Sequence, residues 1–284
     1  MQLAAVTMVY NDPDYMDPWC RHYARQVGAR NCYVIDHGSD DGTTDHLGEI
    51  KVIRLPRSPK DESGRARLVS SFCAELLRRY DAVIHVDVDE LLVADPRHHR
   101  DLADCAMAMK GGVLNAIGLE VWHRPDDEAA IDIAQPISEQ RRWLWFNSAL
   151  CKPALIREPV TWPAGFHSVA APVVFEHLYM FHLRYFDRDR GLRRLAQTRG
   201  MAWADAHSSL HQRGPDQEWL DRLHAVGNLP EEAGDFEPRQ QPLARLLDQV
   251  VASQAGLEAE TYRFALNIHG HTRLVLPPRF RGRF

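Results

Sequence analysis

The chain is poor in cysteine and carries no strong excess of charge. Its five cysteines are odd in number, lie far apart and include no Cys-x-x-Cys pair, so the sequence suggests neither a disulfide framework nor a zinc knuckle. The formal net charge is −5 over 284 residues. We therefore expect no nucleic-acid partner, because a general nucleic-acid binder needs a positive field over the whole domain.

Long apolar runs are also missing. No stretch approaches the roughly 20 apolar residues that are needed to span a bilayer. The segment Met1–Tyr10 has no basic part and is predicted to be a strand rather than a signal peptide. With 45% hydrophobic and 26% charged residues, the composition is that of a soluble globular protein. We expect a cytoplasmic protein without a transmembrane segment, for which peripheral membrane association stays open.

The first part of the chain alternates between strand-like and helix-like patterns. After a first strand, Asp12 and Pro13 are typical of a helix start. Strands are predicted over residues 31–36 and 51–55, and apolar residues recur at helical spacing over 69–80. This alternation predicts an α/β fold with a largely parallel sheet.

The later part is predicted to be mixed. A helix is expected over residues 98–109, a strand over 111–119 and further strands within 141–156. Beyond residue 186 the pattern is helical and polar, with a linker near residues 229–242. No internal repeat is present, and the length fits one large α/β domain or two smaller ones.

Two carboxylates follow the most apolar of the predicted strands. The segment Val83–Leu92 brings Asp87 and Asp89 to the end of a buried strand, and ligands bind at the carboxyl ends of the strands in α/β sheets. Carboxylates there can hold a hard divalent cation and, through it, a phosphate group. The other two Asp-x-Asp pairs of the chain lack this context. We predict a metal or ligand site at Asp87 and Asp89, with a capped strand end as the alternative.

Several segments together resemble the glycosyltransferases of family 2, in particular a bacterial branch. They are Asn11-Asp12, the strand and turn Tyr33–Thr43, Asp87-Val88-Asp89-Glu90, Lys152-Pro153, Gly165-Phe166-His167 and His182–Phe186. The turn is close to the family pattern, from which His37 departs. The paired turn and Asp-x-Asp motif are fairly specific, and the histidine region is less so.

The resemblance covers about residues 1–200 and implies the GT-A fold, in which helices flank a mostly parallel central sheet. It implies a nucleotide-binding half over about 1–110 and an acceptor half over about 111–200. We expect residues 201–284 to form a helical C-terminal extension.

The resemblance also implies a function. The protein is expected to move a sugar from a nucleotide-diphosphate donor, a UDP-sugar, to an acceptor hydroxyl with inversion; a carbohydrate or lipid-linked acceptor stays open. Asp36 would accept a hydrogen bond from the base, Asp87 would lie near the ribose or sugar, and Asp89 would ligate Mn²⁺ or Mg²⁺. A cation would neutralise the charge that builds up on the departing diphosphate. His182 is expected as a second metal ligand, with a buried core histidine as the alternative.

Other roles are assigned from the same pattern. Nucleotide contacts are expected from Asn11, Ser39, Asp41 and Arg65, although the turn at Asp41 is also what such residues form without a ligand. The arginines of residues 184–199 are expected to order on donor binding, with Arg184 or His167 near the phosphates; a plain solvated helix is the alternative. The first candidate for the catalytic base is Glu120. The remaining candidates are Asp126, Asp127, His167 and Glu176, and Trp122, Trp143, Trp145 and Trp162 are candidates for stacking on sugar or for the core.

Two other functions stay open. A nucleotidyltransferase would share the Asp-bound metal, but it would ordinarily have a glycine-rich phosphate loop after the first strand, where this chain has Asn11-Asp12-Pro13-Asp14. A non-catalytic nucleotide-sugar-binding subunit would keep the fold without turnover.

Overall fold

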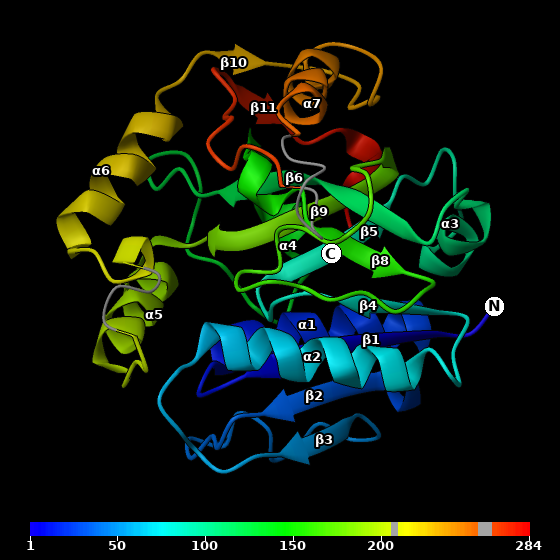
Figure 1. Ribbon diagram of the computed structural model, residues 1–284. Coiled ribbons are helices and arrows are strands. Elements are labelled where there is room, and N and C mark those ends of the chain that lie inside the picture. Colours follow the sequence, from blue (N-terminus) through cyan, green and yellow to red (C-terminus); the bar gives the residue numbers. More distant parts are fainter. Residues whose placement is uncertain (206–209, 255–262) are drawn as a thin grey trace.

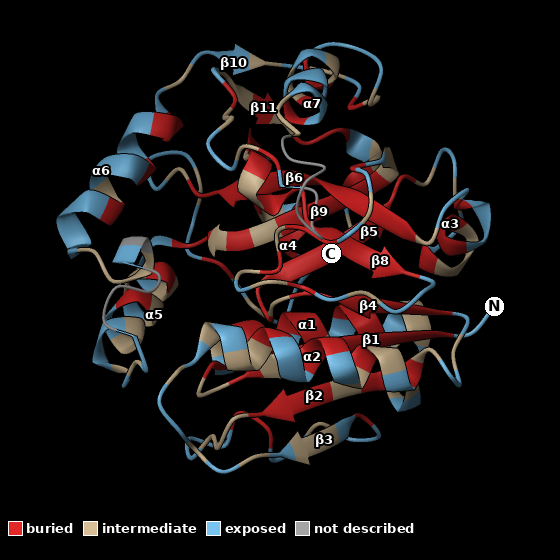
Figure 2. Cartoon of the chain, in the orientation of Figure 1, coloured by how far each residue is buried: buried red, intermediate tan, exposed pale blue. Residues whose placement is uncertain are grey.

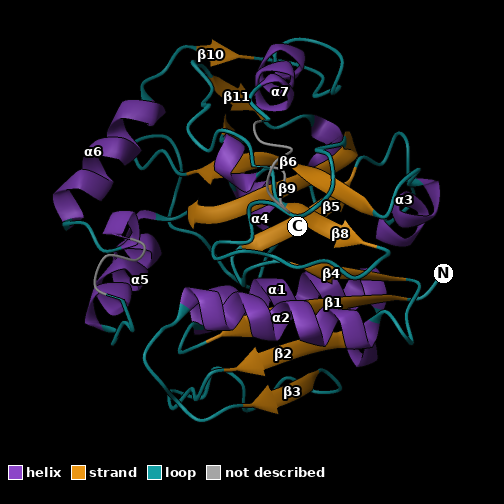
Figure 3. Cartoon of the chain, viewed as in Figure 1, coloured by secondary structure: helices purple, strands orange, loops and turns teal. Residues whose placement is uncertain are grey.

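The structure is a computed structural model that describes residues 1–205, 210–254 and 263–284. Its centre is an 11-stranded sheet with helices on both sides (Figure 3). The strand order is β10-β11-β7-β6-β8-β4-β1-β2-β3, and β5 and β9 pair beside β6. The expected α/β class with a central sheet flanked by helices is confirmed.

The first half of the sheet is parallel. Its strands are β1 (Leu3–Val9), β2 (Cys32–Asp36), β3 (Lys51–Arg54) and β4 (Ala82–His85). Helices α1 (Pro13–Val27) and α2 (Glu62–Leu76) cover its two opposite faces (Figure 1). Successive side chains of β1 point to opposite faces, so Ala5 packs in the core cluster of α1 and Ala4 in that of α2. This explains why the central strands β1 and β4 are buried on both faces.

The second half mixes parallel and antiparallel pairs. Its elements are β5 (Glu90–Ala94), α3 (Leu102–Ala108), β6 (Val113–Trp122), α4 (Ile137–Gln140), β7 (Trp143–Phe146), β8 (Pro153–Ile156) and β9 (Phe175–Tyr185). Helix α3 begins later than expected because the Asp101 carboxylate caps it by accepting from the Asp104 N–H. The strand expected to end at Leu119 continues to Trp122, which places Glu120 inside β6.

The C-terminal part contains helices and also completes the sheet. Its elements are α5 (Arg188–Gly200), α6 (Asp216–Gly227), β10 (Glu231–Glu232), α7 (Leu243–Ala252) and β11 (Arg273–Val275). Strand β11 pairs with β7, and Trp219 of α6 stacks on Tyr185 of β9 with ring centroids 4.8 Å apart. The extension therefore shares a core with the first 200 residues.

Burial follows these layers. Figure 2 shows the central strands buried, while α6 and α7 keep exposed outer faces. Among the described residues, no helix is both long and apolar enough to cross a membrane.

A buried histidine of α1 predicts acid sensitivity of the fold. His22 is 3% exposed and its Nε2 donates to the Leu92 carbonyl at 2.7 Å. Burial lowers the pKa of His22 from 6.5 to about 4, so the unfolded chain takes up a proton more readily than the folded one. The stability contributed by this group is complete above pH 6.5 and is lost as the pH falls toward 4.

When the pH falls from 7.5 to 5, we expect His22 to lower the free energy of unfolding of the wild type by about 2 kcal/mol. Urea unfolding at the two pH values, compared with His22→Gln, measures this difference, because glutamine keeps a donor but does not titrate. His46→Gln, at an exposed histidine, should leave the pH dependence unchanged. An identical pH dependence of wild type and His22→Gln would contradict the assignment.

Candidate active site

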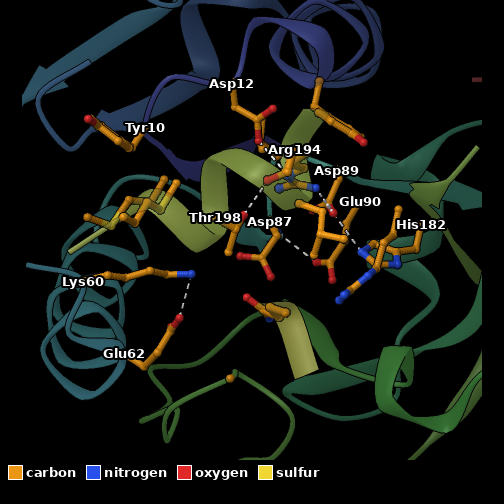
Figure 4. Close-up of a pocket in the computed structure, with 18 of the residues that line it drawn as sticks. Tyr10, Asp12, Lys60, Glu62, Asp87, Asp89, Glu90, His182, Arg194 and Thr198 are labelled. Carbon is orange, nitrogen blue, oxygen red and sulfur yellow. Dashed lines mark hydrogen bonds and ion pairs between the residues drawn. The ribbon is translucent and has the colours of Figure 1, made fainter. Parts of the chain in front are cut away.

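A cavity of about 1040 Å³ opens at the carboxyl ends of the parallel strands β1 and β4. Its wall is formed by the turn after β4, the start of α2, the strands β6 and β9, and helices α5 and α6. In Figure 4, Arg194 lies between Asp12 and Asp89, and Lys60 and Glu62 lie across the cavity from them. The site is thus assembled from both halves of the sheet and from the C-terminal part.

Asp89 and His182 meet in this cavity. Asp89 lies in the turn between β4 and β5, and its Oδ2 is 2.9 Å from His182 Nε2. His182 Nδ1 is 2.7 Å from Glu120 Oε2 on its other side. The sheet register produces this contact, because His182 of β9 pairs with Glu90 of β5 and with Glu120 of β6. Asp89 and His182, both expected as metal ligands, thus lie in contact, and Glu120 orients the ring.

The two carboxylates keep His182 charged. Burial alone would lower the pKa of His182, but Glu120 and Asp89 raise it to about 10. Burial likewise favours a neutral Asp89, yet Arg194 and His182 hold the pKa of that carboxyl well below its usual range. His182 is therefore an imidazolium between two carboxylates when no metal is bound.

The donor set at Asp89 and His182 fits a divalent ion. Their 2.9 Å separation is close to that of two neighbouring ligands at about 2.1 Å in octahedral coordination. A carboxylate that accepts from the second ring nitrogen, as Glu120 does, is the usual partner of a metal-binding histidine. A carboxylate plus an imidazole suits Mn²⁺ better than Mg²⁺, which prefers oxygen ligands. Binding would displace the proton from Nε2.

Asp87 is held by two cations. Its carboxylate pairs with Arg65 of α2, and its Oδ2 lies 2.8 Å from Lys152 Nζ. Lys152 also lies 2.6 Å from Glu90 Oε1. Burial would raise the pKa of Asp87, but Arg65 and Lys152 hold it well below the usual range. Asp87 and Arg65, both expected at the nucleotide, line the cavity as a pair.

The arginine-rich segment is already ordered. It forms α5, which Asp187 caps by accepting from the Arg190 N–H at 3.1 Å. These arginines were expected to order on donor binding, with a helix as the alternative; they form the helix, and acidic partners from the start of α1 and from the Asp89 turn neutralise three of them. The pairs are Arg190 and Arg193 with Asp14, and Arg194 with Asp12 and Asp89.

Asp36 ends β2 as expected, but its carboxylate is used inside the protein. Oδ1 accepts from the Ser39 N–H at 2.8 Å, and Oδ2 accepts from Thr44 Oγ1 at 2.6 Å and Arg54 Nη1 at 3.0 Å. The residue is fully buried and does not line the cavity. Asp36 was expected to bind the nucleobase. In the structure its carboxylate instead shapes the loop after β2.

The other residues of that loop form hydrogen bonds with one another and with Asn11 after β1. The Asn11 N–H donates to Ser39 Oγ at 3.1 Å, and Asp41 Oδ1 accepts from the Thr43 N–H at 2.9 Å. Ser39 does not line the cavity, and Asn11 and Asp41 line a separate hollow of about 320 Å³ beside Arg194. The turn at Asp41 is therefore the one that such residues form without a ligand.

The remaining sequence candidates divide into cavity and core. Arg184, His167 and Trp145 line the cavity. The side chains outside it are Trp122, Trp143 and Trp162, which are buried, and Asp126, Asp127 and Glu176.

Several cavity residues were missed by the sequence analysis. Lys60 is half-buried; its Nζ lies over the Trp203 ring and is 2.9 Å from Glu62 Oε1. Trp219 and His269 come from the C-terminal part. The charged run Lys60-Asp61-Glu62 before the best-defined helix was a usable signal, whereas nothing near Trp219 or His269 indicated a site.

Comparisons with known proteins give weak likenesses. No family model and no curated protein matches the chain. A mannose-1-phosphate geranyltransferase structure from Thermus thermophilus is 12% identical with a TM-score of 0.32, over 100% of this chain and 75% of that one. The galactosyltransferase LgtC, in complex with donor and acceptor sugar analogs, is 19% identical with a TM-score of 0.23, over 43% and 46%. A CMP:2-keto-3-deoxy-manno-octonic acid synthetase complexed with CTP is 12% identical with a TM-score of 0.30, over 79% and 86%. Likenesses of this size do not identify a function.

Proposed function

We propose that the protein is a metal-dependent glycosyltransferase of the GT-A type that uses a nucleoside-diphosphate sugar, a UDP-sugar, as donor. The observation that carries the proposal is the pairing of Asp89 with His182 at 2.9 Å in a large cavity. Asp89 follows the carboxyl end of the parallel strand β4, where α/β sheets bind nucleotides.

Cationic and aromatic side chains support placing the donor beside α2. Arg57 lies over the Tyr10 ring at 3.6 Å, and His37 is next to it in the cavity wall. Arg57 and Tyr10 offer a flat surface on which the nucleobase of the donor could stack. Lys60 and Arg194 face the space in front of Asp89 (Figure 4), where a diphosphate would find charge-assisted hydrogen bonds.

The aromatic side chains of the cavity suit the acceptor. Trp145, Tyr185 and Trp219 line the cavity, together with Arg222 and His269. Aromatic rings with polar tips pack on the apolar faces of sugars while they keep hydrogen bonds at the rim. A carbohydrate or a lipid-linked sugar is the proposed acceptor.

The residues of the site divide the work of an inverting transfer. Asp89 and His182 would hold the ion, which supplies a positive charge to the departing diphosphate. Lys60 and Arg194 stabilise the same developing charge. Glu120, bound to His182, positions that ring. We assign the base to His167, which lines the cavity and whose Nδ1 donates to the Ala149 carbonyl at 2.8 Å, a contact that fixes the orientation of the ring.

The positioning role of Glu120 is separable from a role as base. Glu120→Gln should weaken metal affinity by about 10–100-fold and recover most of its kcat at saturating Mn²⁺, because the proton acceptor is intact. His167→Gln should lower kcat by about 100-fold or more at any Mn²⁺ concentration. Steady-state rates over a Mn²⁺ titration measure both. If Mn²⁺ does not restore the kcat of Glu120→Gln, Glu120 rather than His167 is the catalytic base.

A thermal-shift screen tests the donor class. Nucleotide sugars are added with Mn²⁺ or with a chelator, and a specific donor raises the unfolding temperature by mass action. We expect UDP-sugars to stabilise the protein only with Mn²⁺. Stabilisation by nucleoside triphosphates instead, with pyrophosphate release in the presence of a sugar phosphate, would indicate a nucleotidyltransferase.

A further inference from the structure

Arg194 of α5 contacts the same carboxylate that the proposed metal ion needs. Its Nη1 donates to Asp89 Oδ2, the oxygen that lies 2.9 Å from His182 Nε2. Its Nε lies 2.9 Å from Asp12 Oδ2 on the other side, so the guanidinium bridges two carboxylates (Figure 4). The side chain of Arg194 is 25% exposed and that of Asp89 is 7% exposed. The pair is therefore largely shielded from water, where interactions between charges are strong.

An ion on Asp89 would stand beside this guanidinium. A divalent ion lies about 2.1 Å from a carboxylate oxygen, and Arg194 donates to the oxygen that faces His182. Two cations that share one oxygen repel each other, and the repulsion is large in a partly buried site. In the protein without nucleotide, Arg194 therefore competes with the ion for Asp89.

Once it leaves Asp89, Arg194 has only a weak counter-charge. Burial raises the pKa of Asp12 to about 7, although Arg194 opposes this shift. Asp12 alone therefore balances the guanidinium poorly at neutral pH. The guanidinium also lies over the Tyr15 ring, 4.3 Å from its centroid, but the ring carries no net charge. A second anion beside Arg194, such as a diphosphate, would replace the charge of Asp89.

The surroundings of Arg194 leave room for its side chain to turn. A hollow of about 320 Å³ lies beside it. Four residues line both this hollow and the main cavity, namely Asp12, Tyr15, Arg194 and Gln197. Helix α5 is held here by Gln197, whose Nε2 donates to the Tyr10 carbonyl at 3.2 Å. A turn of the arginine side chain, without a shift of the helix, can thus release the carboxylate.

We propose that Arg194 makes metal binding depend on the nucleotide. Without nucleotide, its guanidinium holds Asp89 and disfavours the ion. When a nucleoside diphosphate enters, the guanidinium turns from Asp89 to the phosphate oxygens, and the ion takes its place on the carboxylate. The protein then binds the ion together with the nucleotide, and each strengthens the binding of the other. This inference rests on the proposed function, because it assumes an ion at Asp89 and His182.

Mn²⁺ binding to the full-length protein, measured by electron paramagnetic resonance with and without UDP, tests this inference. Without UDP, we expect Arg194→Met to bind Mn²⁺ at least about tenfold more tightly than the wild type, because the competing cation is gone. With saturating UDP, and after correction for Mn²⁺ bound to free UDP, the two proteins should bind Mn²⁺ about equally. An arginine that contacts only the diphosphate would leave the Mn²⁺ affinity without UDP unchanged.

Two further variants separate the contact from the general charge effect. Arg193→Met removes the same charge from the same helix, but Arg193 pairs with Asp14 and does not line the main cavity. It should bind Mn²⁺ like the wild type. The double variant Asp12→Asn with Arg194→Met keeps the net charge of the wild type and leaves no carboxylate of Asp12 buried without its cation. Without UDP, it should also bind Mn²⁺ more tightly than the wild type.

The outcomes distinguish this inference from the proposed function. If the wild type and both Arg194 variants bind Mn²⁺ with equal affinity without UDP, or if Arg193→Met gains as much as Arg194→Met, the inference is overturned and the metal site stays in place. If none of the proteins binds Mn²⁺, with or without UDP, the metal site at Asp89 is overturned, and the proposed function and this inference fall with it.

Discussion

The Asp89→Asn variant is expected to lose Mn²⁺-dependent UDP binding by about 100-fold or more while it stays folded. The amide keeps the shape of the side chain but removes the charge that pairs with His182 and Arg194. A neutral amide is also a poor substitute for a carboxylate ligand. Calorimetric titration of UDP, with Mn²⁺ and with a chelator, measures the loss.

Asp14→Asn is the matched control for this variant. Asp14 also pairs with arginines of α5, Arg190 and Arg193, but it does not line the main cavity. We expect Asp14→Asn to bind UDP within a few-fold of the wild type. If Mn²⁺ and UDP stabilise Asp89→Asn as strongly as the wild type, the metal is not held at Asp89.

Lys152→Met is expected to lower the free energy of unfolding by about 3–5 kcal/mol, the usual cost of breaking a buried ion pair from one side. Lys152 is 7% exposed, and its ammonium contacts both Asp87 and Glu90. Methionine fills a similar volume but leaves Glu90, which is 1% exposed, without its cation. Urea unfolding of the purified variant measures the change.

Two further variants isolate the charge effect. Lys110→Met removes an exposed lysine and should change stability by no more than about 0.5 kcal/mol. Adding Glu90→Gln to Lys152→Met should restore part of the loss, because glutamine can still accept from the Asp87 N–H, as Glu90 Oε2 does at 2.9 Å. If Lys152→Met lowers the free energy of unfolding by less than about 1 kcal/mol, the ion pair of Lys152 with Glu90 contributes no more than an exposed surface pair.

The sequence was sufficient for the elements that depend on local pattern. The apolar run before Asp87 and the helical spacing from Val69 onward predicted β4 and α2. The pairing of His182 with Asp89 was anticipated only through the family resemblance. The contact itself is made by β9 lying between β5 and β6, and no local pattern reports the register between strands so distant in the chain.

Where the sequence analysis was wrong, a partner from elsewhere in the chain was responsible. Asp36 matched a base-binding pattern, but Thr44 and Arg54 fill its hydrogen-bonding capacity. The arginines of residues 184–199 were expected to order on donor binding, whereas Asp12 and Asp14 already pair with Arg194 and Arg190. A like-charged run says little about order until its partners are known.

Release of nucleoside diphosphate from a panel of nucleotide sugars by the wild-type protein is the most direct test of the central proposal. With Mn²⁺ present, we predict slow release of UDP from at least one UDP-sugar, absence of release with a chelator, and absence of release by Asp89→Asn. Release that is unaffected by the chelator and by Asp89→Asn would contradict the account, as would complete inactivity toward every nucleotide sugar together with Mn²⁺-dependent pyrophosphate release from a nucleoside triphosphate.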